Sequence, residues 1–374
     1  MGKLVLYRKY RPKSFSDVIG QDHVVRTLKN AIKSDNVSHA YLFTGPRGTG
    51  KTTMARLLAK AVNCLDDSDP EPCNTCSACK TIGDGKAVDL IEIDAASHRG
   101  IDEIRELREG IKFSPNELKY KVYIIDESHQ LTRGAANALL KILEEAPEHA
   151  IFVLATTEPQ KMIPTIISRC QRFDFKKLNL NEIVKKLEII LKKEKIKANK
   201  KTLEAIATAS GGSFRDAESL LDQILTFTDK ELKEEDVKNI LGLVEAEYLA
   251  NFVDYLISGE RLEAINYLED LYRQGLGPEE FHGSLLEYLR QLMMVSISKP
   301  DLAEGENPLV SGLKVKFTKE EIEKLKKQSE KLDPEKVRIM LEVFLEAGKR
   351  MDYSSIPQLP LEMAIVQLTD NDEF

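Results

Sequence analysis

The residues with the clearest chemistry form one glycine-rich run, Gly45-Pro46-Arg47-Gly48-Thr49-Gly50-Lys51-Thr52. Glycines at this spacing let backbone N–H groups point inward at phosphate oxygens, and a helix that starts here favours negative charge. In such a P-loop Lys51 reaches the β- and γ-phosphates, and Thr52, with Thr53 beside it, offers a hydroxyl to Mg²⁺. A strand expected over 40–44 and a helix expected over 53–62 flank the run, which disfavours an ordinary glycine turn. The run therefore predicts a nucleoside triphosphate site.

Two adjacent acids, Asp126 and Glu127, follow an apolar run over 122–125. Nucleotides bind at the carboxyl edge of sheets made of such strands. Because side chains alternate along a strand, the two carboxylates are expected to point in different directions. We expect Asp126 to hold the hydration shell of Mg²⁺ and Glu127 to orient and polarise an attacking water. Two acids after a strand more often form a solvated turn, but the P-loop at this separation favours catalysis.

Four of the five cysteines are clustered in one segment, at Cys64, Cys73, Cys76 and Cys79. In a chain without an export signal, such clustering indicates metal ligands before disulfides. Four thiolates suit a closed tetrahedral Zn²⁺ site, which would staple the insertion over 64–79 and leave no catalytic position open. An iron–sulfur cluster is the alternative. Cys170 lies apart and is expected to be a small buried side chain.

The elements that must position these residues are strands over 40–44, 89–93, 122–125 and 151–155. Each is apolar and is followed by a polar turn and a helical period, which is typical of parallel strands covered by crossover helices. We therefore expect a doubly wound α/β domain to about residue 178. The last run ends in Thr156-Thr157, whose hydroxyls suit a phosphate or water contact, although two β-branched residues ending a strand are the simpler interpretation.

After residue 178 the pattern becomes helical. A small helical domain is expected over 179–243, where Ser213 and Asp216 resemble a capping box. A helical packing module is expected over 244–374, because apolar residues recur three and four apart. No apolar run is long enough for a membrane span or a signal peptide, so a cytoplasmic protein without membrane contact is expected.

The net charge of −7 disfavours a protein that coats nucleic acid by bulk attraction. A local contact remains open, because Arg105, Arg108 and Lys112 share one edge of the helix expected over 101–113 and suit a phosphate backbone. An exposed helix with its own ion pairs is the more common explanation of such a pattern.

Together these segments closely resemble the bacterial gamma/tau clamp-loader family. The resemblance covers nearly all of residues 4–243, and over 244–374 it consists mainly of helical pattern. The segments that carry it are 7–12, 15–21, the P-loop, the cysteine insertion, 91–97, 126–129, 154–157 and Ser168-Arg169-Cys170. The cysteine insertion paired with Ser-Arg-Cys is the specific part, because generic AAA+ ATPases lack that pairing.

The resemblance implies an AAA+ ATPase domain (1–178), a helical lid (179–243) and an oligomerisation collar (244–374), with ATP, Mg²⁺ and Zn²⁺. It implies that Arg169 reaches the γ-phosphate bound by a neighbouring subunit, whereas Arg215 senses nucleotide in its own subunit. Thr157, and less surely Thr156, would be the sensor at a strand tip. The adenine pocket would be formed by Tyr7, Arg11, Val18 and Ile19. Candidates for duplex DNA contact are Arg99, Arg105 and Arg133.

By the same resemblance, the chain is a motor subunit that opens the sliding clamp and loads it on primer–template DNA. The expected partners are delta and delta-prime subunits and copies of itself in a pentamer, within the DNA polymerase III holoenzyme. The family's long form carries a tail that binds the helicase and polymerase, and no such contact is inferred for a sequence ending at Phe374. The competing hypotheses are a monomeric P-loop kinase and a nucleotide-binding scaffold that never hydrolyses.

Overall fold

The chain divides into two compact units, Met1–Val237 and Lys238–Phe374. A computed structural model describes residues 5–227, 231–233, 237, 246–297 and 319–370. The boundary expected between residues 243 and 244 lies outside the described residues.

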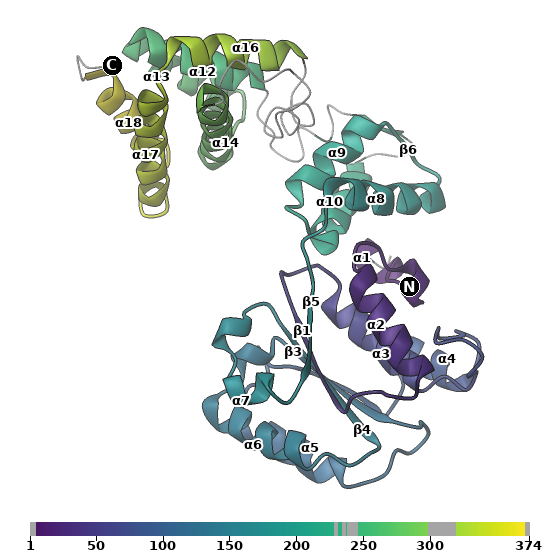
Figure 1. Cartoon of the computed structure of the whole chain (residues 1–374). Helices are drawn as coiled ribbons and strands as arrows, with labels where there is room; N and C mark the ends of the chain where they lie inside the picture. The colour runs from purple at the N-terminus through teal and green to yellow at the C-terminus, as the bar shows by residue number, and fades with distance from the viewer. Residues whose placement is uncertain (1–4, 228–230, 234–236, 238–245, 298–318, 371–374) are drawn as a thin grey trace. The chain divides into compact units, whose positions relative to one another are not determined.

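The first unit is built on a five-stranded parallel sheet with the order β2-β3-β4-β1-β5 (Figure 1). The strands are β1 (Ala40–Thr44), β2 (Leu90–Asp94), β3 (Lys121–Asp126), β4 (Ala150–Thr156) and β5 (Gln171–Asp174). The four expected strands are confirmed, each end within one residue of its expected place. The edge strand β5 was not expected, because only Phe173 among its residues is buried.

Helices cover both faces of this sheet, as the α/β pattern predicts (Figure 1). Because side chains alternate along a strand, Tyr41 and Phe43 pack with α2 and α3, whereas Ala40 and Leu42 pack with α5, α6 and α7. The helices are α1 (Leu6–Lys9), α2 (Asp22–Lys33), α3 (Lys51–Val62), α4 (Ser77–Gly83), α5 (Ile101–Ile111), α6 (Arg133–Glu144) and α7 (Pro164–Ile167). Short 3₁₀ turns are η1 (Phe15–Asp17), η2 (Ser128–Gln130) and η3 (Pro159–Lys161).

The carboxyl ends of the central strands meet at one edge of the sheet. There β1 leads into the glycine-rich loop, β3 ends at Asp126 and β4 ends at Thr156. Thr44 and Thr156 are in register, and Gly45 N donates a hydrogen bond to Thr156 O at 3.2 Å. The parallel topology therefore brings three segments, distant in sequence, to one place.

Beyond the sheet domain, the described part of the first unit contains the helices α8 (Leu180–Glu194), α9 (Lys200–Ala209) and α10 (Phe214–Phe227). Asn179 caps α8 in a capping box with Glu182, and Asn199 caps α9 through the Thr202 amide. Ser213 Oγ accepts from Asp216 N at 3.3 Å, so the expected start of α10 is confirmed. The helical region also contains a two-residue parallel ladder, β6 (Lys197–Ala198) with β7 (Glu231–Leu232), which the sequence did not suggest.

The second unit is helical throughout its described part and has its own core. Phe252, Phe281 and Phe344 are fully buried at its centre, with ring centroids of Phe252 and Phe281 5.1 Å apart. Its helices are α12 (Ala246–Ser258), α13 (Arg261–Arg273), α14 (Pro278–Ile297), α16 (Lys319–Lys331), α17 (Pro334–Met351) and α18 (Leu359–Asp370). The expected fold class, a parallel-sheet α/β domain followed by a helical lid and an all-helical C-terminal region, is confirmed. None of the helices in the described part combines the length and apolar character that a membrane span requires.

Candidate nucleotide and metal sites

The glycine-rich loop joins β1 to α3 with a backbone that only glycine adopts easily. Gly45 has φ +142°, and a Cβ on it would lie 2.3 Å from Phe175 O. Gly48 has φ +74°, and a Cβ on it would lie 1.8 Å from Ser213 Oγ. Phe214 N also donates a hydrogen bond to Gly48 O at 3.1 Å. The loop therefore lies directly against the first turn of α10.

Gly48→Ala is expected to weaken nucleotide binding by about tenfold or more, because it adds both backbone strain and a clash with Ser213. Calorimetric titration with a magnesium complex of a non-hydrolysable ATP analogue measures the change. Gly85→Ala is the matched control, since Gly85 has φ +70° with no atom within 4 Å of the added Cβ. Equal affinities for the Gly48→Ala variant and the wild type would contradict this account of the loop.

Lys51 begins α3 and is folded back into the loop. Its Nζ donates to Gly45 O at 2.7 Å and to Pro46 O at 2.9 Å. Burial lowers the pKa of Lys51, and the carboxylates of Glu127 and Asp126 oppose that change. The ammonium is thus held by groups that a phosphate can replace, in a place where positive charge is poorly solvated.

The acids at the end of β3 have different partners, as strand alternation predicts. Thr52 Oγ1 donates to Asp126 Oδ2 at 2.7 Å, which places together the hydroxyl and the carboxylate that suit a shared Mg²⁺. Glu127 has a left-handed backbone with φ +46°, and its side chain accepts from Thr157 Oγ1 at 3.0 Å. The hydroxyl at the tip of β4 therefore fixes the carboxylate of Glu127.

Thr156 and Thr157 differ in their surroundings. Thr156 is fully buried, and His129 Nδ1 lies 3.0 Å from its Oγ1. Only Thr157 is both partly exposed and in contact with Glu127. Among the two, the geometry favours Thr157 for a role beside the terminal phosphate.

The loop and the acids open on a cavity of about 460 Å³. The expected site residues that line it are Tyr7, Arg11, Val18, Ile19, Arg47, Gly48, Thr49, Gly50, Lys51, Thr52, Thr53, Asp126, Glu127 and Arg215. Gly45 and Pro46 lie behind it and contact Lys51, while Thr157 reaches it through Glu127. Arg169 does not line it, because the guanidinium pairs with Glu144 of α6 at the surface.

The N-terminal segment and α10 meet over this cavity. The Arg215 guanidinium lies 5.2 Å from the centre of the Tyr7 ring, within range of a cation–π contact. Among the further lining residues that sequence reasoning missed are Lys186 of α8 and Glu218 of α10. Lys186 Nζ donates to Tyr10 O at 2.7 Å and lies 3.6 Å from Glu218 Oε1. The sequence signal that could have identified Lys186 is its place among the buried, mostly apolar positions of α8.

Burial raises the pKa of Glu218 to about 7, although the Lys186 ammonium opposes the rise. A carboxyl with a raised pKa binds its proton more tightly in the folded chain. Its contribution to stability is thus complete below its ordinary value of 4.5 and lost as pH rises through 7. Glu218→Gln should remove this loss, so the variant gains stability relative to the wild type across that window. Urea unfolding at a series of pH values measures the difference in stability. If stability changed with pH in the same way in the wild type and in Glu218→Gln, the raised pKa assigned to Glu218 would be wrong.

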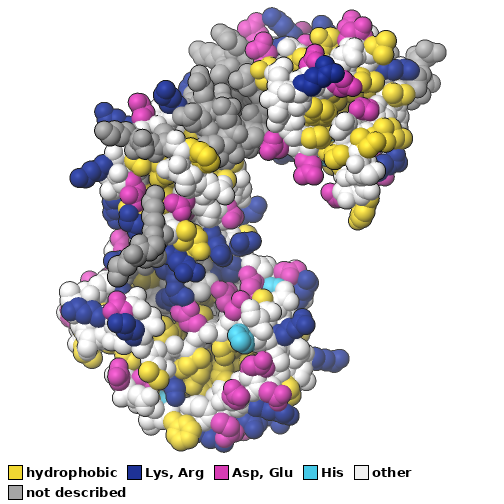
Figure 2. All heavy atoms as spheres, turned by 180° about the vertical axis from the view of Figure 1, so that it is seen from behind, with side chains coloured by type: hydrophobic (Ala, Val, Ile, Leu, Met, Phe, Trp, Pro, Cys, Tyr) yellow, Lys and Arg dark blue, Asp and Glu magenta, His cyan; other side chains and the backbone are white. Residues whose placement is uncertain are grey.

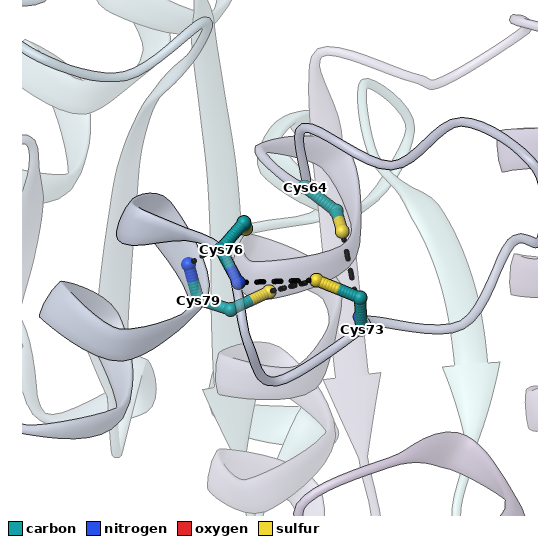
Figure 3. Close-up of side chains that lie close together, drawn as sticks. All are labelled: Cys64, Cys73, Cys76 and Cys79. Atoms are coloured by element: carbon teal, nitrogen blue, oxygen red, sulfur yellow. Dashed lines mark hydrogen bonds between the residues drawn. The ribbon is translucent and has the colours of Figure 1, made fainter.

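The four clustered cysteines converge on one point (Figure 3). Their Sγ atoms all lie within 4.8 Å of one another, and Cys73 Sγ is 4.0 Å from Cys79 Sγ. A tetrahedral Zn²⁺ with bonds of about 2.3 Å would hold the sulfurs about 3.8 Å apart, so this donor set fits zinc. Backbone amides of Cys73, Cys76 and Cys79 donate to the sulfurs at 3.4 Å, which favours thiolates.

Cys170 behaves as expected of an isolated small side chain. It is partly buried beside the α5–α6 core, and burial raises the pKa of its thiol to about 12. Such a thiol is unreactive at neutral pH.

The three arginines considered for DNA contact are exposed and lie on neighbouring segments. Arg105 is on α5 and pairs with Asp102 at 2.9 Å, and Arg133 begins α6. Thr132 N donates to Arg99 O at 3.1 Å, which joins the loop before α5 to the start of α6. On the face seen in Figure 2, Lys and Arg side chains lie among Asp and Glu rather than in a patch of one sign.

Comparison with known proteins relates the whole chain to one complex. A family model described as DNA polymerase III, delta subunit, matches residues 20–179. The model for the clamp-loader ATPase lid domain of DNA polymerase III matches 182–230, and that for gamma and tau domain III matches 232–373. All three models describe DNA polymerase III subunits, and the one over 232–373 names gamma and tau.

Individual sequence relatives are also subunits of DNA polymerase III. DNA polymerase III subunit tau of Bacillus subtilis is 43% identical over 98% of this chain, and the chain spans 63% of that protein. Subunit tau of Escherichia coli is 36% identical over 98% of this chain, which spans 55% of it. Among solved structures, the Thermotoga maritima RuvB branch migration motor is 18% identical over 66% of this chain and 79% of its own, with a TM-score of 0.48, a likeness that carries no functional information. The sequence relatives and the consecutive family models place the chain in the family of gamma and tau subunits of DNA polymerase III.

Proposed function

We propose that this chain binds and hydrolyses ATP as a motor subunit of the bacterial clamp loader within the DNA polymerase III holoenzyme. The observation that carries the proposal is the convergence of Lys51, the Thr52–Asp126 pair and the Glu127–Thr157 pair on one cavity, with Arg215 opposite. Each of these groups answers one requirement of phosphoryl transfer to water.

The roles follow from the contacts. The loop amides and Lys51 bind the β- and γ-phosphates, and Thr52 and Asp126 hold Mg²⁺, which when bound neutralises phosphate charge. Glu127 orients the attacking water and accepts its proton, while Thr157 keeps the carboxylate aimed. Tyr7, Arg11, Val18 and Ile19 enclose the adenine base, and Arg215 contacts the phosphates from the lid.

The last group in the proposed site is an arginine supplied by a neighbouring subunit. Arg169 is exposed and does not line the cavity of its own chain, which supports the role we assign to it beside the nucleotide of a neighbouring subunit. Hydrolysis then depends on assembly.

The domain organisation proposed for this cycle is an AAA+ domain (1–178), a lid (179–243) and a collar (244–374). The collar holds a pentamer with further copies of the chain and with delta and delta-prime subunits. In the bacterial cytoplasm, ATP binding by this assembly opens the sliding clamp and grips primer–template DNA, with Arg99, Arg105 and Arg133 near the duplex. Hydrolysis releases the clamp on DNA. Zn²⁺ on the four cysteines is structural.

ATP hydrolysis by the purified chain alone, then with partner subunits, clamp and primer–template DNA, tests this function. We expect weak turnover alone and strong stimulation by clamp and DNA together. Phosphate transfer to a small acceptor by the lone chain would favour a P-loop kinase instead. Tight ATP binding with no turnover in the complete mixture would favour a scaffold.

A further inference from the structure

Two sets of contacts join the four-cysteine segment to the N-terminal segment beside the nucleotide cavity, and the first is made by a partly buried carboxylate. Glu71 lies between Pro70 and Pro72, two residues before Cys73. Its Oε2 accepts from Phe15 N at 2.7 Å, and its Oε1 accepts from Lys29 Nζ at 2.9 Å. The Glu71 side chain is only 17% exposed. It therefore ties the metal segment to the N-terminal segment and to α2.

A second link runs beside the first. Lys60 of α3 is buried; its Nζ donates to Asn74 Oδ1 in the cysteine segment and lies 3.4 Å from Lys13 O. Asn74 has a left-handed backbone with φ +60°, between two of the cysteines. Both links thus end on the backbone of residues 13–15.

In the sequence, residues 13–15 lie between two groups of residues that line the cavity. Tyr7, Arg11 and Pro12 precede them, and Asp17, Val18 and Ile19 follow them. Phe15 itself is 1% exposed and packs in the core with Val24 and Leu28. A shift at Phe15 consequently moves cavity-lining residues on both sides.

Glu71 lies in a segment without regular secondary structure. Between the end of α3 and the start of α4, residues 63–76 contain no helix or strand, and three of the four cysteines lie in this stretch. A segment of this kind has little core of its own and depends on metal binding for its conformation. A surface pair such as Glu71–Lys29 contributes little by itself, but a carboxylate bonded to the amide of a buried residue is the stronger kind of contact.

We infer that occupation of the four-cysteine site and ATP affinity are thermodynamically coupled, and that Glu71 is the positioning residue that carries the coupling. The inference rests on the proposed ATP binding at the P-loop. Coupling between two ligands is reciprocal, so bound nucleotide raises the affinity for Zn²⁺ by the factor by which Zn²⁺ raises the affinity for nucleotide.

The test uses the full chain with Zn²⁺ bound and after chelation followed by buffer exchange into Mg²⁺. Calorimetry with Mg²⁺–AMPPNP is expected to show binding weaker by about fivefold or more without Zn²⁺. Glu71→Ala with Zn²⁺ bound should show a similar loss, and removing its Zn²⁺ should then change affinity by less than about twofold. Asp67→Ala, at an exposed acid of the same insertion, is the control and should match the wild type.

If the zinc-free chain unfolds, the effect of nucleotide on Zn²⁺ affinity can be measured instead. Competition with a zinc chelator should show tighter Zn²⁺ retention with AMPPNP in the wild type and no such gain in Glu71→Ala. A purely structural Glu71 would lower stability without abolishing this gain. Equal nucleotide affinity with and without Zn²⁺, or an undiminished gain in Glu71→Ala, would overturn the inference. Absence of nucleotide binding by the zinc-bound wild type would instead refute the proposed function.

Discussion

Glu127→Gln is expected to lower ATP hydrolysis by the assembled complex by about 100-fold or more, because the neutral amide cannot accept the proton of the attacking water. Nucleotide affinity should stay within about twofold, since Lys51, Thr52 and Asp126 keep their contacts with the phosphates and Mg²⁺. Steady-state hydrolysis and calorimetric binding separate the two effects.

The matched control is Glu158→Gln. Glu158 lies just past the end of the neighbouring strand β4, and its Oε2 is 3.1 Å from His129 Nε2, but it does not line the cavity. Its substitution should leave turnover nearly unchanged. If Glu127→Gln retained wild-type turnover, the role assigned to this carboxylate would be wrong.

Arg169→Ala is expected to lower DNA-stimulated hydrolysis by about a thousandfold in a complex where every copy carries the change, the range found for arginines supplied in trans. The isolated chain should bind ATP as the wild type does, because Arg169 does not line its own cavity. Comparing turnover of reconstituted complexes with binding by isolated chains measures both.

Glu144→Gln supplies the control for this experiment. It removes the carboxylate that pairs with Arg169 in the isolated chain but leaves the guanidinium intact. Turnover in the complex should therefore be retained. A reconstituted Arg169→Ala complex with full DNA-stimulated hydrolysis would eliminate the proposed trans mechanism.

The sheet could be predicted where strands are buried on both faces. Residues 40–44 and 151–155 are continuous, mostly apolar runs, because helices cover both faces of the sheet at these strands. The strand at 171–174 has three exposed residues out of four and pairs only with β1, so no apolar run marks it. Its existence depends on tertiary pairing, which a local pattern does not contain.

The same limit applies to the cavity. Lys51, Thr52, Asp126 and Glu127 follow from loop spacing and strand ends, because each lies next to an element with a clear pattern. Glu218 does not, since only its place opposite Lys186 across two helices distinguishes it from any other helical acid. The role of Arg169 came from family resemblance alone, and its salt bridge at the surface shows why a single chain could not reveal it.

The contacts of Gly48 with Ser213 and Phe214 leave no spare distance between the glycine-rich loop and the first turn of α10. In the proposed function, a shift of this loop on nucleotide binding would reach α10 directly through the Phe214–Gly48 hydrogen bond. Because this contact is direct, substitutions in the distant core should change the stability of the fold without changing how α10 responds to nucleotide.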